Sequence, residues 1–111
     1  MIDAMSTALS GMRAQTMRLE SSANNVANSQ TEGYVPSSVN MAEGVDGGVR
    51  TQLQKPVAAT GVAQDAENKT SMVDQAKEMI SMMESKSMYQ ANMKTVQTSE
   101  RMVGNLLDTV G

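Results

Sequence analysis

Apolar residues recur at helical spacing in the first quarter of the chain. They stand three or four residues apart at Ile2, Met5, Leu9, Met12, Leu19, Ala23 and Val26, with Thr16 at the remaining position of the series. Such steps are typical of a heptad stripe on an amphipathic helix. Asp3 suits the positive end of the helix dipole, and Asn28 precedes a polar stretch. The pattern predicts a helix over about 3–28.

The last third of the chain repeats the pattern. Apart from interruptions at Gln75, Lys86 and Glu100, one heptad register is apolar, with Met72, Met79, Met82, Tyr89, Met93, Val96, Val103, Leu107 and Val110. Ser71, followed three residues later by Asp74, resembles a capping box in which Asp replaces the usual Glu. We therefore predict a second helix from about 72 to 109, with Gly111 at its end.

The segment between these helices has a different composition. Both Pro residues and most of the Gly residues fall within 29–70, without a sustained helical period. Val49, Thr51 and Leu53 alternate with polar neighbours and predict one short strand, preceded by a turn at 46–48. The expected fold is mainly α: two long terminal helices form an antiparallel or coiled-coil-like pair, joined by a short loop and β segment. The expected single domain comprises an N-terminal helix (1–28), a connector (29–70) and a C-terminal helix (71–111).

A chain of 111 residues has a small core and cannot cover every face of two long helices. Aromatic packing is almost absent, because the chain has two Tyr, no Phe and no Trp, while twelve Met residues supply flexible apolar surface. We expect the remaining apolar surface to need a partner. Since packing is what chiefly stabilises such helices, the free chain is expected to be partly disordered and to become ordered on assembly.

The composition argues against several classes of function. The chain has no His and no Cys, its carboxylates are scattered singly, and the Gly-rich segment 44–48 lacks the Lys-Ser/Thr of a phosphate loop. We expect no enzyme activity, no metal and no cofactor. A net charge of −3 without basic clusters predicts no nucleic-acid partner. No apolar run is long enough to span a membrane, and the pattern of a cleaved secretory signal is missing from the N-terminal segment.

Two stretches carry a resemblance to a known family. Residues 8–34 resemble the N-terminal signature of flagellar axial proteins, the rod and hook family, which reads as Leu-Ser-Gly, then Ala-Asn-Asn-hydrophobic-Ala-Asn, then Thr-Pro-Gly-Tyr. The matching positions are Leu9, Ser10, Gly11, Ala23, Asn24, Asn25, Val26, Ala27, Asn28, Thr31, Gly33 and Tyr34. Glu32 replaces the usual Pro, and Val35 stands where a basic residue is common.

Residues 78–111 look like the C-terminal signature of the same family. There, Glu-Met precedes a Tyr-x-Ala-Asn block and a leucine-rich end, matched by Glu78, Met79, Tyr89, Ala91, Asn92, Leu106 and Leu107. Two signatures in the right order at the two ends are more specific than either alone.

The resemblance implies a structural subunit of the bacterial flagellar basal-body rod. In that family the paired terminal helices form the inner part of a helical tube, and the flagellar export apparatus carries the subunits outward without a cleaved signal peptide. Its partners would be copies of itself, other rod subunits and the export apparatus, and its location would be the periplasmic rod. The short middle segment favours a proximal-rod subunit over hook and distal-rod relatives, which carry large inserted domains.

Residues from both segments are expected to mediate assembly. They are Leu9, Gly11, Met12, Leu19, Asn24, Asn25, Val26, Asn28, Thr31, Gly33, Tyr34, Met79, Met82, Tyr89, Asn92, Met93, Val96, Val103 and Leu107. Asn28 is interpreted first as a helix terminator, whereas Asn24 and Asn25 are equally consistent with bonding between subunits. Gly33 permits a positive φ, and Tyr34 can anchor the turn on the helices.

A second interpretation stays open. The Met-rich helices also suit a secretion chaperone or adaptor that holds a partner helix in a groove and forms a discrete complex. An enzyme ranks third, because a carboxylate or Lys site would need a pocket that this small core scarcely encloses.

Overall fold

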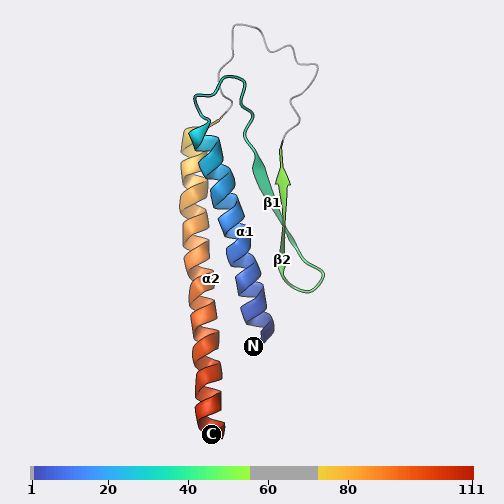
Figure 1. Ribbon diagram of the computed structural model, residues 1–111, viewed down its shortest axis with the longest axis vertical. Coiled ribbons are helices and arrows are strands. Elements are labelled where there is room, and N and C mark those ends of the chain that lie inside the picture. Colours follow the sequence, from blue (N-terminus) through green and yellow to red (C-terminus); the bar gives the residue numbers. More distant parts are fainter. Residues whose placement is uncertain (1, 56–72) are drawn as a thin grey trace.

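The computed structural model describes residues 2–55 and 73–111. Helix α1 spans Ile2–Ala27, strands β1 and β2 span Ser38–Glu43 and Val49–Gln54, and helix α2 spans Gln75–Val110. The two helices lie side by side and antiparallel, with the hairpin on the opposite side of α1 from α2 (Figure 1). The prediction of a mainly helical fold with two long terminal helices and a short β segment is confirmed.

The ends of the helices follow from local capping. Asp74 is the N-cap of α2, and its carboxylate accepts a hydrogen bond from the Lys77 backbone N–H at 3.3 Å. The helix therefore begins at Gln75 rather than at 72, and Ser71 of the expected capping box lies outside the described residues. At the other end of α2, the Gly111 N–H donates to the Leu107 carbonyl at 2.9 Å. The helix therefore ends at Gly111, as the sequence predicted.

The hairpin contains one strand more than the alternation predicted. β1 pairs antiparallel with β2, with Val39 opposite Leu53, Met41 opposite Thr51 and Glu43 opposite Val49. The turn between them has Gly47 at a φ of +80°, which favours glycine. β1 itself alternates, with Val39 and Met41 half-buried between exposed neighbours. The sequence of residues 38–43 therefore contains a weaker alternation of apolar and polar residues that indicates this additional strand.

Facing residues fix the register of the helix pair. Gly11 lies against Asn92, Ser22 bonds to Ser81, and Asn25 bonds to Glu78. Each step forward along α1 is thus matched by one step back along α2. The same register places Arg101 opposite Ile2, the first residue of α1. The residues of α2 that follow Arg101 therefore extend beyond the end of α1 (Figure 1). We call Met102–Val110 the overhang.

The seam between the elements consists of small and polar residues. Among described side chains, the buried apolar ones are Ala8 and Ala14, and the buried polar ones are Gln15, Ser21, Ser22, Asn25, Ser85 and Ser99. The larger residues of the predicted heptad stripe stay at least partly open, with Leu9 44% and Leu19 39% exposed. The two backbones approach closely over small residues, and this displaces the bulky stripe from the seam.

Candidate functional site

Asn25 occupies the junction of α1, the following loop and α2. Its side chain is 1% exposed, and its amide nitrogen donates to the Ser37 carbonyl at 2.8 Å and to Glu78 Oε1 at 2.9 Å. Its amide oxygen accepts from the Tyr34 hydroxyl and from the Ser37 backbone N–H, both at 3.0 Å. Ser21 adds a further bond to the Ser37 carbonyl at 3.1 Å. Both donor hydrogens and the acceptor oxygen of this buried amide are therefore satisfied within the chain.

The turn after α1 is built to return Tyr34 to this amide. Asn28 donates from its side chain to the Asn24 carbonyl at 2.9 Å, which satisfies one of the open carbonyls at the helix end. The Thr31 hydroxyl donates to the Asn28 side-chain oxygen at 3.2 Å. Gly33 then takes a φ of +69°, so the chain reverses and the half-buried Tyr34 lies against the junction. The terminating role predicted for Asn28 matches this geometry.

A polar contact continues between the helices below this junction. Arg18 donates from Nε to the Ser81 hydroxyl at 3.2 Å and forms a salt bridge from Nη2 to Glu84, also at 3.2 Å. The salt bridge is half exposed on its Glu84 side, so water screens most of its contribution. It serves chiefly to hold the register, because a shifted register would separate the two side chains.

Packing against α2 explains why a glycine stands at position 11 within α1. A Cβ added there would come within 2.8 Å of the Asn92 amide nitrogen, so a larger residue would force the Asn92 side chain to move at this crossing. Gly104 differs, because a Cβ there would meet nothing within 4 Å in the described chain. Of these two glycines within helices, Gly11 is therefore closely packed by the described residues and Gly104 is not.

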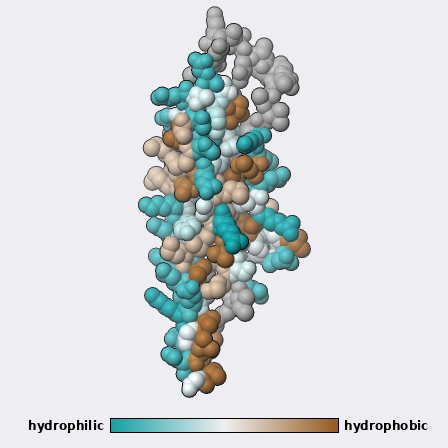
Figure 2. Space-filling view, in the orientation of Figure 1, coloured by the Kyte–Doolittle hydropathy of each residue, from teal (hydrophilic) through white to brown (hydrophobic). Residues whose placement is uncertain are grey.

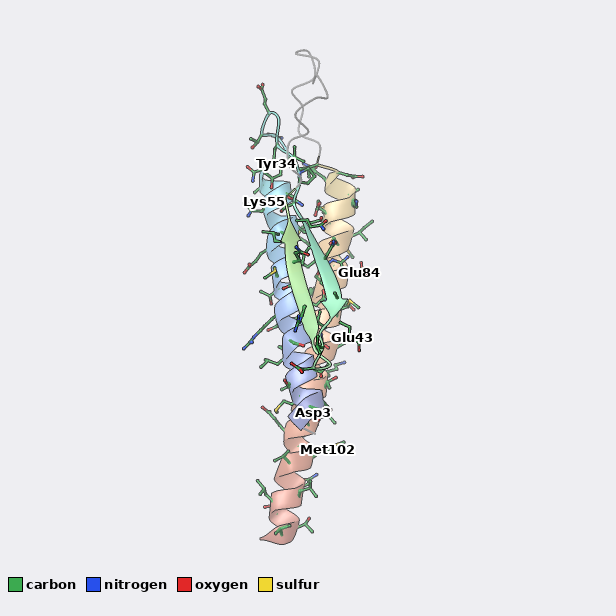
Figure 3. All side chains as sticks on the ribbon, turned by 90° about the vertical axis from the view of Figure 1, so that its right-hand side faces the viewer. Asp3, Tyr34, Glu43, Lys55, Glu84 and Met102 are labelled. Carbon is green, nitrogen blue, oxygen red and sulfur yellow. The ribbon has the colours of Figure 1, made fainter. Side chains whose placement is uncertain are left out.

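The hairpin is fixed to α1 near its start. The Thr7 hydroxyl donates to the Gly47 carbonyl, and the Val49 backbone N–H donates to the Ser10 hydroxyl, both at 3.1 Å. A groove of about 840 Å³ lies between α1, β1 and α2. Gln15 lines it, and its amide nitrogen reaches the sulfur of Met88 at 3.4 Å. Asp3 and Glu43 lie near the end of the groove that points toward the overhang (Figure 3).

Within residues 2–55 and 73–111, no group of three or more acidic side chains is placed to hold a metal ion. Neither described helix is long and apolar enough to cross a lipid bilayer.

Two family models match the chain at its two ends. The model described as flagella basal body rod protein matches residues 5–34, and the model described as flagellar basal body rod FlgEFG protein C-terminal matches residues 68–109. The chain belongs to the flagellar basal body rod protein family. The two matches together cover more than half of this rod protein, and they confirm the resemblance of both signatures. No curated protein matches it in a sequence comparison.

Because the chain belongs to this family, it is a structural protein of the flagellar basal-body rod. Asn25 and Tyr34 lie in the first matched segment and Glu78 in the second, so their hydrogen bonds join the two segments that define the family. In this rod protein the junction holds the two matched segments in their antiparallel arrangement.

The residues predicted for assembly divide by exposure. Gly11 and Asn25 are buried; Met12, Val26, Asn28, Tyr34, Met82, Tyr89, Asn92 and Val96 are half-buried; Leu9, Leu19, Asn24, Thr31, Gly33, Met79, Met93, Val103 and Leu107 are exposed. Of the two asparagines considered for bonding between subunits, Asn25 makes its hydrogen bonds inside the rod protein, whereas the Asn24 side chain is exposed. The assembly role of the whole set stays a prediction.

Several residues of the junction were not predicted. Ser37 contributes a carbonyl, an N–H and a hydroxyl to Asn25 and Ser21, yet it lies in a segment whose composition indicates only loop. Arg18 and Ser81 looked like ordinary polar positions of helices. Arg18 shares its helical phase with Gly11, Ser22 and Asn25 and not with the apolar stripe, and this phase is the signal that could have identified a second contact face on α1.

Proposed function

We propose that this rod-family protein assembles, through its two terminal helices, with copies of itself and other rod subunits into a helical axial tube. The observation that carries the proposal is the distribution of side-chain sizes. The seam within the chain uses small and polar residues, whereas most of the large apolar residues of both helices remain exposed. Exposed apolar surface of this extent marks an interaction site.

On α1 the open surface is the predicted heptad stripe. Leu9 and Leu19 are exposed, and Met5 and Met12 are half-buried at its border. The hairpin and most of α2 contact other sides of α1. Tyr89 of α2 lines hollows beside Leu9, Met12 and Leu19, but it leaves this stripe partly open. We call Met5, Leu9, Met12 and Leu19 the open α1 face.

On α2 the open surface extends over most of the helix. Near its start, Met79, Ile80 and Met83 are 58%, 64% and 71% exposed. At its other end every residue of the overhang is exposed, and hydrophobic side chains gather over this lower end of the molecule (Figure 2). An isolated stretch of helix this short is marginal in water, so packing in an assembly would stabilise it.

The positions of these surfaces favour open growth over a closed dimer. The open α1 face and the overhang are different surfaces, so a contact between them is heterologous and continues from copy to copy unless the rotation closes a ring. Growth of this kind gives a helical tube. The short hairpin between the helices is the feature that favours a proximal-rod position, and family membership supports export by the flagellar apparatus to the periplasmic rod.

The test combines assembly in solution with incorporation in cells. Sedimentation velocity of the purified chain over a range of concentrations should show growth into large, elongated species, and negative-stain microscopy should show helical order. A Leu9→Ser and Leu107→Ser double variant should stay small, whereas the control Asn105→Ser, at an exposed polar position, should behave as wild type.

In cells, the same double variant should fail to restore basal-body rods and swimming to a deletion strain. Wild-type swimming by that variant would contradict the proposal. A discrete complex of fixed small stoichiometry with a partner helix would instead favour the adaptor interpretation.

A further inference from the structure

The overhang continues the face of α2 that contacts α1. Steps of seven residues from Ser85 lead to Asn92, Ser99 and then Leu106, and steps of seven from Tyr89 lead to Val96, Val103 and Val110. In the paired part of α2, Ser85 and Ser99 are buried, while in the overhang Leu106 is 54% exposed. Side chains on this face therefore change from small and polar to large and apolar where α1 no longer lies opposite.

This change indicates that the overhang packs on a different surface from the rest of α2. Close approach to the small seam of α1 needs small side chains, whereas Val103, Leu106 and Leu107 need a partner with large apolar residues and gaps between them. The open α1 face offers such residues, because Met5, Leu9 and Met12 recur at heptad spacing beside the seam.

Charge complementarity sets the alignment of the two surfaces. Glu100 precedes the overhang, and Arg13 follows Met12 on the exposed side of α1; neither forms an ion pair within the described residues. If an antiparallel helix pair places Glu100 beside Arg13, each later residue of α2 lies opposite the preceding residue of α1. Val103 then falls between Leu9 and Met12, and Leu107 falls between Met5 and Leu9.

We propose that the overhang of one copy packs antiparallel on the open α1 face of a second copy, aligned by an ion pair between Glu100 and Arg13. The inference deepens the proposed assembly function and rests on it. Because α1 and α2 are antiparallel within each chain, this contact keeps all copies pointing in the same direction. The C-terminal end of one helix also meets the N-terminal end of another, which the helix dipoles favour.

The contact also defines a displacement along the long axis. Within one chain the register places Gln90 opposite Arg13, whereas between copies Glu100 takes that place. At about 1.5 Å per residue, neighbouring copies are therefore shifted by about 15 Å. A contact shifted in one direction is heterologous, so it propagates.

Charge reversal tests the alignment. Arg13→Glu and Glu100→Arg should each raise the critical concentration for assembly about threefold to tenfold at low salt, because each places like charges together. The double variant should return it to within about twofold of wild type. Arg101→Glu, which reverses a neighbouring charge outside the proposed pair, is the matched control and should change the critical concentration little.

Cross-linking tests the contact directly, because the native chain has no cysteine. In the Leu9→Cys and Val103→Cys double variant, the helix register separates the two positions by about 13 Å within a chain, too far for a disulfide. Oxidation should therefore give a ladder of covalent oligomers. The control pair Leu9→Cys and Thr98→Cys, with its second cysteine outside the overhang, should give no ladder.

The outcomes separate this inference from the proposed function. Polymer that forms normally, without the ladder and without rescue by the double charge reversal, would overturn the inference and leave the assembly function intact. A wild-type chain that stays monomeric at every concentration, alone and with other rod subunits, would contradict both.

Discussion

Replacing Asn25 with Ala tests whether the buried amide holds the two helices together. The substitution removes two donated hydrogen bonds, to the Ser37 carbonyl and Glu78, and two accepted ones, from Tyr34 and the Ser37 N–H, at 2.8–3.0 Å. A typical hydrogen bond contributes about 0.5–1.5 kcal/mol net, and a buried group left without a partner costs about 1–3 kcal/mol. Because Ser37 and Tyr34 are only half-buried and recover part of their bonding from water, we expect a loss of about 2–4 kcal/mol in the free energy of unfolding.

Asn24→Ala provides the matched control. It makes the same chemical change one residue earlier on the same helix, but the Asn24 side chain is exposed. Since Ala has the higher helix propensity, this variant should be unchanged or more stable by about 0.5 kcal/mol. Urea unfolding followed by circular dichroism, at a concentration where the chain is monomeric, measures both variants. A difference between them below about 0.5 kcal/mol would refute the structural role assigned to Asn25.

Three further changes probe particular positions. Gly11→Leu should hinder assembly more than secretion, because its side chain displaces Asn92; export and assembly assays of this variant test the difference. Gly104→Ala should leave the fold intact and raise helix stability by up to about 1 kcal/mol, which thermal unfolding measures. Gly33→Ala should lower the unfolding free energy by about 1–2 kcal/mol, because a φ of +69° is strained for any residue with a Cβ, and an unchanged urea midpoint would contradict this. Ser85→Ala should be neutral or stabilising by up to about 1 kcal/mol, since the buried Ser85 hydroxyl has no hydrogen-bond partner among residues 2–55 and 73–111; a large loss of stability would contradict this.

The signatures determined more of the local structure than the periodicity alone. Asn28 terminates α1, Gly33 takes the positive φ, and Tyr34 returns to the helix, each in the place that the first signature gives it. The exposed heptad positions are also consistent with the expectation that a lone chain cannot cover its own apolar surface, since Leu9 and Leu107 remain 44% and 68% exposed.

The sequence by itself determined the two helices, the turn glycines and the family. Periodicity, capping residues and φ preferences are local properties, so they can be recognised from neighbouring residues. Only the tertiary structure decided which face each helix buries. Close approach selected the side of α1 with Gly11, Ser22 and Asn25, and left the bulkier stripe outside. Helical spacing identifies an apolar face, but it does not state which chain will cover that face, because this depends on distances between residues far apart in sequence.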